Sequence, residues 1–176
     1  MEFFSPLKDK CLPSNTDLLY IGGGYPEVFI KELNENYSIT KDIQEKLNSG
    51  LHCYAECGGL MYLMGSIDGV ETVGFFKGNA RMSSRLQNFG YAKLSVSKKN
   101  ELLPLGFHIN CHEFHKSFVD SEEERIYKLT KESYDGSLKK WECGYKKLNT
   151  IGAYAHVHFF SNIKMLEFLT KGKVIR

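Results

Sequence analysis

The sequence predicts an α/β fold, with a central and largely parallel sheet, flanking helices and additional strands in the second half. The first third of the 176 residues alternates short apolar runs with segments of helical period, which is typical of strand–helix–strand–helix units. After Gly65 the segments are strand-like, with few helical periods. A hydrophobic content of 42% over this length suits one domain with its own core, residues 1–176.

The first elements follow from local chemistry. Residues 2–6 are expected to form a short strand, and residues 17–21 a buried strand that ends in three consecutive glycines. A helix should follow, because Pro26 suits a helix start and Glu27 suits the first turn. The apolar residues of this helix are expected to be Val28, Phe29 and Leu33.

A second helix is predicted to begin at Ser38 or Thr40 and to end at Gly50, since glycine suits the position after a helix. Its apolar residues recur every four positions: Ile39, Ile43 and Leu47. The apolar run 51–54 is predicted to be the next strand, which leads through a sharp turn into a helix that contains residues 60–64.

The second half is predicted to hold several strands and one last helix. The strand-like segments are residues 73–82, 89–96, 105–119, 124–130, 141–147 and 150–159. Asp135-Gly136 is predicted to form a tight turn. Ser161 is expected to cap the last helix and Gly172 to end it. The apolar residues of that helix are Ile163, Leu166 and Leu169.

Residues 54–59, at the turn between the second strand and its helix, form the most informative stretch. A nucleophile on such a turn is lifted clear of the sheet, beside the first unpaired backbone N–H groups of the helix. The crowded turn needs small neighbours, which Ala55, Gly58 and Gly59 supply. Cys57 is therefore a candidate nucleophile whose thiol the helix dipole helps to ionise, and the Gly58 N–H is a candidate oxyanion donor. The alternative is that Cys57 is a small buried hydrophobic residue.

Further candidates lie far from this turn in the sequence. Gly23 or Gly24 is a candidate for a second oxyanion donor, and the alternative is a flexible connection. The phosphate-binding patterns GxxxxGK[ST] and GxGxxG are both absent. A cysteine nucleophile needs a base, and His156, at the tip of a late strand, is well placed to be one. His52 is a poor candidate, because it lies upstream on the nucleophile's own strand. The alternative for His156 is a satisfied core or surface histidine.

Four possible metal ligands, His108, Cys111, His112 and His115, occur close together. On a helix they would share one face. The surrounding residues 105–115 read better as a strand, in which His108 and His112 face one side and the other two the opposite side. A single ion could not collect all four, so no metal site is predicted.

Bulk composition excludes several classes of protein. A net charge of +2 implies neither nucleic acid nor a membrane surface as a partner. The apolar runs are too short to span a bilayer, and residues 1–6 lack the basic and apolar regions of a signal peptide. Five cysteines without a CxxC pair fit free thiols in a reducing compartment. The sequence therefore predicts a cytoplasmic protein.

Several separated stretches together resemble one family. They are residues 3–7 (FFSPL), 20–27 (YIGGGYPE), 54–63 (YAECGGLMYL), 85–91 (RLQNFGY), 112–117 (HEFHKS) and 156–159 (HVHF). The chain resembles the class I glutamine amidotransferase domain of cobyrinate a,c-diamide synthase, and the stretches follow the order in that family. The resemblance implies a class I amidotransferase-like sheet with flanking helices.

The resemblance also implies a mechanism. Cys57 would attack the carboxamide of glutamine, while the N–H of Gly58 and one N–H of Gly23 or Gly24 hold the oxyanion. His156 would take the thiol proton and pass it to departing ammonia, and water would hydrolyse the thioester to glutamate. In the family the ammonia reaches an ATP-dependent synthetase domain, which amidates acetate side chains a and c of a cobalt corrinoid.

The chain departs from the family pattern in two ways. The synthetase domain, where ATP and magnesium are expected, is absent, and so are the strand and helix that precede residues 3–7 in the family. The chain is therefore expected to be an N-terminally truncated piece without a cofactor of its own. Self-association is expected of such a piece, with a homodimer as one form of it. Related triad amidotransferases also place a glutamate two residues after the catalytic histidine, where this chain has His158. Two alternatives stay open: another group orients the imidazole, or Cys57 and His156 act as a dyad. The third member of the triad is left unassigned.

Three other functions stay open at this stage. The same chemistry could serve a,c-diamidation of nickel sirohydrochlorin, since the tetrapyrrole site is expected mainly in the absent domain. The chain could be a catalytically silent binding or regulatory module. It could also be a cysteine hydrolase of similar topology that acts on another amide.

Overall fold

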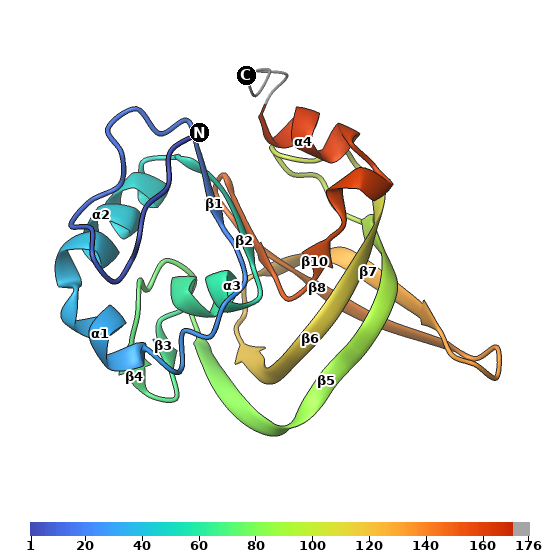
Figure 1. The fold of residues 1–176 in the computed structure, drawn as a ribbon. Coiled ribbons are helices and arrows are strands. Elements are labelled where there is room, and N and C mark those ends of the chain that lie inside the picture. Colours follow the sequence, from blue (N-terminus) through green and yellow to red (C-terminus); the bar gives the residue numbers. More distant parts are fainter. Residues whose placement is uncertain (171–176) are drawn as a thin grey trace.

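The computed structural model describes residues 1–170, so Gly172, expected to end the last helix, lies outside the described residues. The strands of this part join one mixed sheet, and the helices are short. Figure 1 shows α1, α2 and α3 gathered around β1 and β2 on one side, and the long strands β5 to β8 on the other. The elements and their bounds are β1 (Leu18–Ile21), α1 (Ile30–Glu35), α2 (Tyr37–Asn48), β2 (His52–Glu56), α3 (Gly58–Leu63), β3 (Ser66–Ile67), β4 (Val70–Glu71), β5 (Asn79–Val96), β6 (His108–Asp120), β7 (Glu124–Glu132), β8 (Leu138–Lys147), β9 (Thr150–Ala153), β10 (His156–Val157), the 3-10 turn η1 (Phe159–Ser161) and α4 (Lys164–Leu169).

The part of the sheet that carries the site is parallel. β1 pairs with β2, and β2 pairs with β9, both in parallel, although β9 comes about a hundred residues later in the chain. The carboxyl ends of parallel strands meet at one edge of a sheet, where α/β proteins place their sites. This topology brings the glycines after β1, Cys57 after β2 and the segment after β9 to the same edge.

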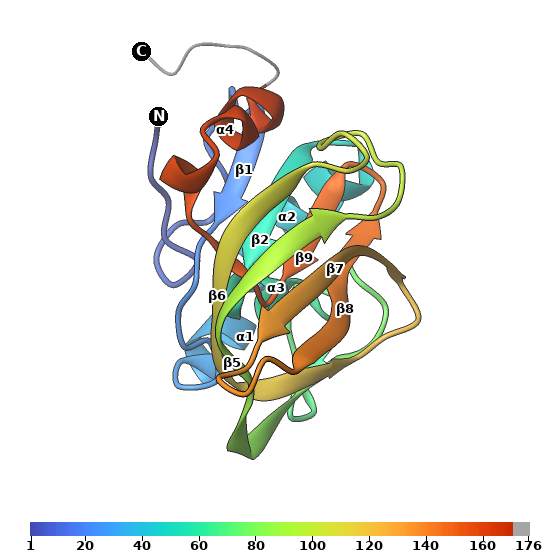
Figure 2. The ribbon, with the colours of Figure 1, turned by 90° about the vertical axis from the view of Figure 1, so that its right-hand side faces the viewer.

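The second half of the chain builds an antiparallel extension of the sheet. β5 pairs with β6 and β7, β7 with β8, and β8 with β9, all antiparallel (Figure 2). β5 and β6 form a long curved ribbon whose register shifts near Gln87 and Gly90. The predicted strand at 73–82 is wrong in its first part, because the strand begins only at Asn79. The segments predicted at 73–82 and 89–96 are in fact one continuous strand, β5.

Helix α2 confirms the prediction made from its four-residue period. Ile39, Ile43 and Leu47 are fully buried, and Gly50 follows the helix with a φ of 94°. That positive φ is costly for any residue with a Cβ, which is why glycine stands there. The predicted turn at Asp135-Gly136 is also confirmed, since the Gly136 N–H donates to the Ser133 carbonyl between β7 and β8.

Three local predictions are wrong. Residues 2–6 form no strand, because an asparagine from the helical layer ties this segment down: the Asn36 side chain donates to the Pro6 carbonyl. Val28 and Phe29 lie in the turn before α1 and are exposed, so that of the expected apolar residues only Leu33 is buried in the helix. Ser161 belongs to η1, and α4 is capped by Ile163 without a side-chain hydrogen bond.

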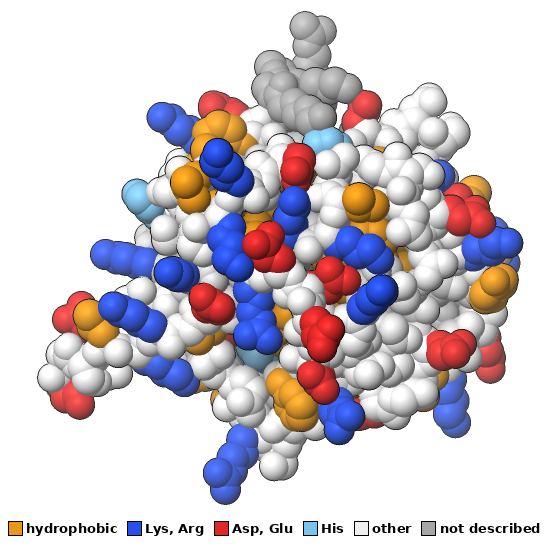
Figure 3. Space-filling model, turned by 180° about the vertical axis from the view of Figure 1, so that it is seen from behind, with side chains coloured by type: hydrophobic (Ala, Val, Ile, Leu, Met, Phe, Trp, Pro, Cys, Tyr) orange, Lys and Arg blue, Asp and Glu red, His pale blue; other side chains and the backbone are white. Residues whose placement is uncertain are grey.

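The surface carries charges of both signs. Figure 3 shows acidic and basic side chains scattered over the same face. The cysteines are free thiols, and only Cys11 among them is exposed. Among residues 1–170, no helix is long and apolar enough to cross a membrane.

Candidate active site

Cys57 occupies a strained turn between β2 and α3. Its φ of 49° and ψ of −105° lie outside the regions that residues with a Cβ normally adopt. Two hydrogen bonds hold the turn: the Cys57 N–H donates to the Ala153 carbonyl at 2.7 Å, and the Cys57 carbonyl accepts from the Met61 N–H at 3.1 Å. The residue is 7% exposed. The structure therefore places the sulfur at the rim of the sheet, beside the first residues of α3.

The glycine run after β1 packs against the start of α3, backbone to backbone. A Cβ on Gly58 would lie 2.5 Å from the Gly24 carbonyl oxygen and 2.9 Å from the Gly24 nitrogen. A Cβ on Gly59 would overlap the Ile21 carbonyl. The structure thus brings Gly23, Gly24 and Gly58, the residues predicted to bind an oxyanion, together next to Cys57.

His156 reaches the same place from the other end of the chain. A Cβ on Gly23 would overlap the imidazole ring, so the ring lies directly over the glycine run. Hydrogen bonds to Cys57 and to Glu56 raise the pKa of His156 to about 10, although partial burial opposes the shift. The raised pKa favours the protonated imidazole at neutral pH.

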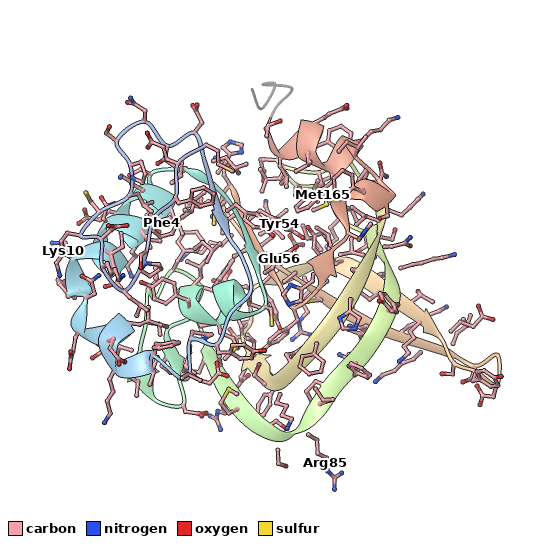
Figure 4. The ribbon with its side chains drawn as sticks, viewed as in Figure 1. Phe4, Lys10, Tyr54, Glu56, Arg85 and Met165 are labelled. Carbon is pink, nitrogen blue, oxygen red and sulfur yellow. The ribbon has the colours of Figure 1, made fainter. Side chains whose placement is uncertain are left out.

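Glu56, which the sequence analysis did not single out, is the third group at this site. Its side chain is 5% exposed, and its Oε2 lies 3.5 Å from Nδ1 of His156. Oε2 also accepts from the Tyr20 hydroxyl at 2.8 Å, and Oε1 accepts from the Val157 N–H at 3.0 Å. Figure 4 shows Glu56 between the end of β2 and β10. The sequence feature that could have identified Glu56 is the position of its carboxylate, directly before the candidate nucleophile Cys57.

The other histidines lie apart from Cys57. His52 is at the opposite end of β2, about 13 Å along the strand from the last residue of β2. The His158 N–H donates to the Asn110 carbonyl, and its ring packs edge-on to Phe160. Neither arrangement puts the imidazole beside the sulfur.

The four possible metal ligands lie on the strand β6, as the sequence predicted. Cys111 and His115 are buried on one face, whereas His108 on the opposite face is exposed. His115 contacts the Glu113 carboxylate at 3.2 Å and stacks on Tyr154, with ring centroids 3.7 Å apart. Its surroundings are thus a buried hydrogen-bonded cluster. Among residues 1–170, no group of three or more metal-ligating side chains comes together.

We expect Gly58→Ala to lower the rate of any reaction that uses this turn by about 100-fold, the usual loss when an oxyanion donor is displaced. The added methyl group must push the backbone of Gly24 away, because nothing flexible is in its path. Steady-state kinetics and a thermal melt of the variant test this expectation. Gly22→Ala is the matched control, since its Cβ makes only an ordinary 3.6 Å contact with Tyr20. Equal rates for the two variants would contradict the assignment of this loop.

Comparison with known proteins identifies the family. A profile for the CobB/CobQ-like glutamine amidotransferase domain matches residues 1–163. The chain belongs to this family. The predicted resemblance is confirmed, and the cysteine turn, the glycine run and the late histidine all lie inside the matched range.

Three curated relatives of high identity share one name. Cobyrinate a,c-diamide synthase of Clostridium acetobutylicum is 60% identical over 169 residues, which is 96% of this chain and 39% of that protein. The proteins of that name from Clostridium tetani and Listeria innocua are 58% and 41% identical, over 95% and 93% of this chain and 39% and 37% of theirs. The chain therefore spans about two fifths of the length of these relatives.

Solved structures confirm the predicted fold class. A glutamine amidotransferase of Thermotoga maritima aligns with a TM-score of 0.52 at 13% identity, over 88% of this chain and 61% of that one. PurLQS from the same organism aligns with a TM-score of 0.57 at 14% identity, over 91% and 79%. At such low identity the likeness shows the fold alone: an α/β domain with the parallel strands at the site.

Proposed function

We propose that this chain is the glutaminase portion of a cobyrinate a,c-diamide synthase, and that it releases ammonia from glutamine for ATP-dependent amidation. One observation carries the proposal: in a chain 60% identical to such a synthase, His156 meets Cys57 and the glycine run at one edge of the sheet. A cysteine, a neighbouring histidine and closely packed backbone N–H groups are the parts that acyl transfer requires.

The reaction divides into two halves. The Cys57 sulfur attacks the carboxamide carbon of glutamine, and the carbonyl oxygen takes up the negative charge between the N–H groups of Gly58 and of Gly23 or Gly24. The C–N bond then breaks, and His156 gives its proton to the departing ammonia. Water next attacks the thioester, His156 takes a proton from that water, and glutamate leaves as the sulfur is released. Catalysis of this kind combines a nucleophile, a proton carrier and an oxyanion site.

The raised pKa of His156 suits its role as the proton donor to the departing ammonia. Because the pKa is raised to about 10, the protonated ring is favoured at neutral pH until a more basic group accepts the proton. The nitrogen that leaves the carboxamide as an amide anion is such a group. The contact with Cys57, the largest cause of the shift, is lost once the sulfur has bonded to the carboxamide carbon, so the imidazolium should then release its proton to the leaving nitrogen more easily.

Partners and cofactors follow from the same proposal. Glutamine is the substrate of this domain, and a synthetase portion would bind ATP, magnesium and the corrinoid. No cofactor is needed for the thioester chemistry, which uses the side chains of this chain alone. We place the protein in the cytoplasm, where its free thiols would stay reduced. Self-association of the chain, including a homodimer, remains a prediction that size-exclusion chromatography can test.

The experiment that tests this function uses the full-length protein. Glutamine, ATP and magnesium are supplied with either cobyrinate or nickel sirohydrochlorin, and the products are resolved by mass spectrometry. We expect cobyrinate to gain two amides, with one glutamate formed for each. Amidation of nickel sirohydrochlorin but not of cobyrinate would contradict the corrinoid assignment. Glutamate formation without any amidation would contradict the proposed coupling of glutamine hydrolysis to amidation.

A further inference from the structure

We propose that Glu56 is a positioning residue that orients His156 for the amidotransferase reaction. It would do so in place of the glutamate that related triad amidotransferases carry two residues after the histidine. The inference rests on the proposed function, since it assigns a role within the same site. The new claim is that the carboxylate that orients His156 comes from Glu56. This residue directly precedes the nucleophile and lies on a neighbouring element of the fold.

The carboxylate of Glu56 is held by three groups from two elements. Tyr20 on β1 donates its hydroxyl to Oε2 at 2.8 Å, and the Val157 N–H on β10 donates to Oε1 at 3.0 Å. His156 on β10 places Nδ1 3.5 Å from Oε2. A carboxylate this deeply buried is stable only if its oxygens are satisfied, and these contacts satisfy both. The side chain therefore has a fixed position from which to act.

The same carboxylate fixes both the backbone and the ring of the β10 segment. β10 has only two residues and pairs with β6 alone, so it has few ladder bonds of its own. Glu56 adds a bond to the Val157 N–H and a contact to the His156 ring from the facing strand β2. With Nδ1 directed to Glu56, the other ring nitrogen is left for the Cys57 sulfur. The His156–Glu56 distance of 3.5 Å is long for a hydrogen bond, and such contacts commonly shorten when the substrate binds.

His158 cannot supply the missing carboxylate. An imidazole carries no negative charge, and the His158 ring packs against Phe160 rather than against His156. Tyr20 supports Glu56 as a neutral donor, because burial and the nearby Glu56 charge raise the pKa of the Tyr20 hydroxyl. The chain thus keeps a buried orienting carboxyl group at the site but draws it from another position in the sequence.

The groups that face His156 determine what a pH profile should show. Cys57 and Glu56 contact the ring, Tyr20 binds Glu56, and His112 is the pairing partner of His156 on β6. Glu56 contributes to the raised pKa of His156 through its hydrogen bond and its charge. Removing that charge lowers the pKa, so the imidazolium is lost at a lower pH. The alkaline limb of the activity profile should then move toward neutral pH.

The test compares Glu56→Gln and His158→Gln in the full-length protein, by glutamate release from pH 6 to pH 10 and by synthesis driven with added ammonia. We expect Glu56→Gln to lower kcat for glutamine hydrolysis by about 100-fold, with KM within about 3-fold, and to shift the alkaline limb downward. Ammonia-driven synthesis should be unchanged, because it bypasses this site. His158→Gln should leave both the rate and the profile near those of the unmodified protein.

The outcomes separate the inference from the function. Unchanged kinetics of Glu56→Gln in an active protein would overturn the inference and leave the proposed function standing. A lower rate with an unshifted alkaline limb would also overturn it, since a purely structural role of Glu56 would produce that result. Partial recovery by Glu56→Asp would support it. If the unmodified protein releases no glutamate, the proposed function itself fails, whatever the Glu56 variants do.

Discussion

Cys57→Ala is expected to abolish glutamine hydrolysis, with a loss of at least about 10⁴-fold in kcat, because no other group can form the thioester. Synthesis driven by added ammonia should stay within about 2-fold of the unmodified protein, since a substitution of this size at the strained turn leaves the synthetase portion intact. Glutamate release from glutamine and amide formation with added ammonia, both measured on the full-length protein, check the expectation.

Cys11→Ala is the matched control for this variant. Cys11 is the exposed free thiol of the chain and lies in the connection before β1, so its loss should leave glutamine hydrolysis unchanged. The buried Cys53 on β2 is a poorer control, because its side chain packs in the hydrophobic core. Retention of glutamine turnover in Cys57→Ala would show that a different group is the nucleophile.

His156→Ala should reduce glutamine hydrolysis by about 10³-fold, whereas His158→Ala should reduce it by no more than about 3-fold. The structure explains the difference: His156 lies over Gly23 beside Cys57, and His158 packs against Phe160. Steady-state glutamate release from both variants at pH 8 tests it. Thermal melts exclude unfolding as the cause, and equal losses in the two variants would contradict the assignment of His156 as the proton carrier.

Local sequence signals predicted the parts of the site that are defined by short stretches. The cysteine turn could be predicted because Ala55, Gly58 and Gly59 are small residues between an apolar run and a segment of helical period. Helix α2 could be predicted because its buried apolar residues keep a strict four-residue spacing. In both places the local chemistry and the tertiary packing agree, which is the condition under which sequence patterns succeed.

Predictions failed where tertiary contacts override local chemistry. The strand expected at residues 150–159 is two short strands. β9 lies between β2 and β8, and after Tyr154 the chain changes direction, so that β10 pairs with β6 instead. That break directs His156 toward the site, and the residues of this segment carry no local sequence signal for the break. The segment 2–6 is apolar enough for a strand but is held by Asn36 and has no neighbouring strand.

Glu56 was missed for a related reason. In a strand of buried residues a carboxylate next to a candidate nucleophile reads as an isolated polar residue, and its partners lie 36 residues upstream at Tyr20 and 101 residues downstream at Val157. Only the fold brings those partners together. The sequence clue was His158, at the position where related triad amidotransferases have a glutamate, which left open whether another group orients His156.

Covalent labelling with a glutamine-mimicking electrophile tests the central claim most directly. The reagent carries a diazoketone in place of the carboxamide, and the modified peptides are mapped by mass spectrometry. We expect one adduct, on Cys57, which excess glutamine suppresses and which leaves the exposed Cys11 unmodified. A folded protein in which Cys57 stays unmodified, or in which Cys11 reacts as fast, would contradict the account.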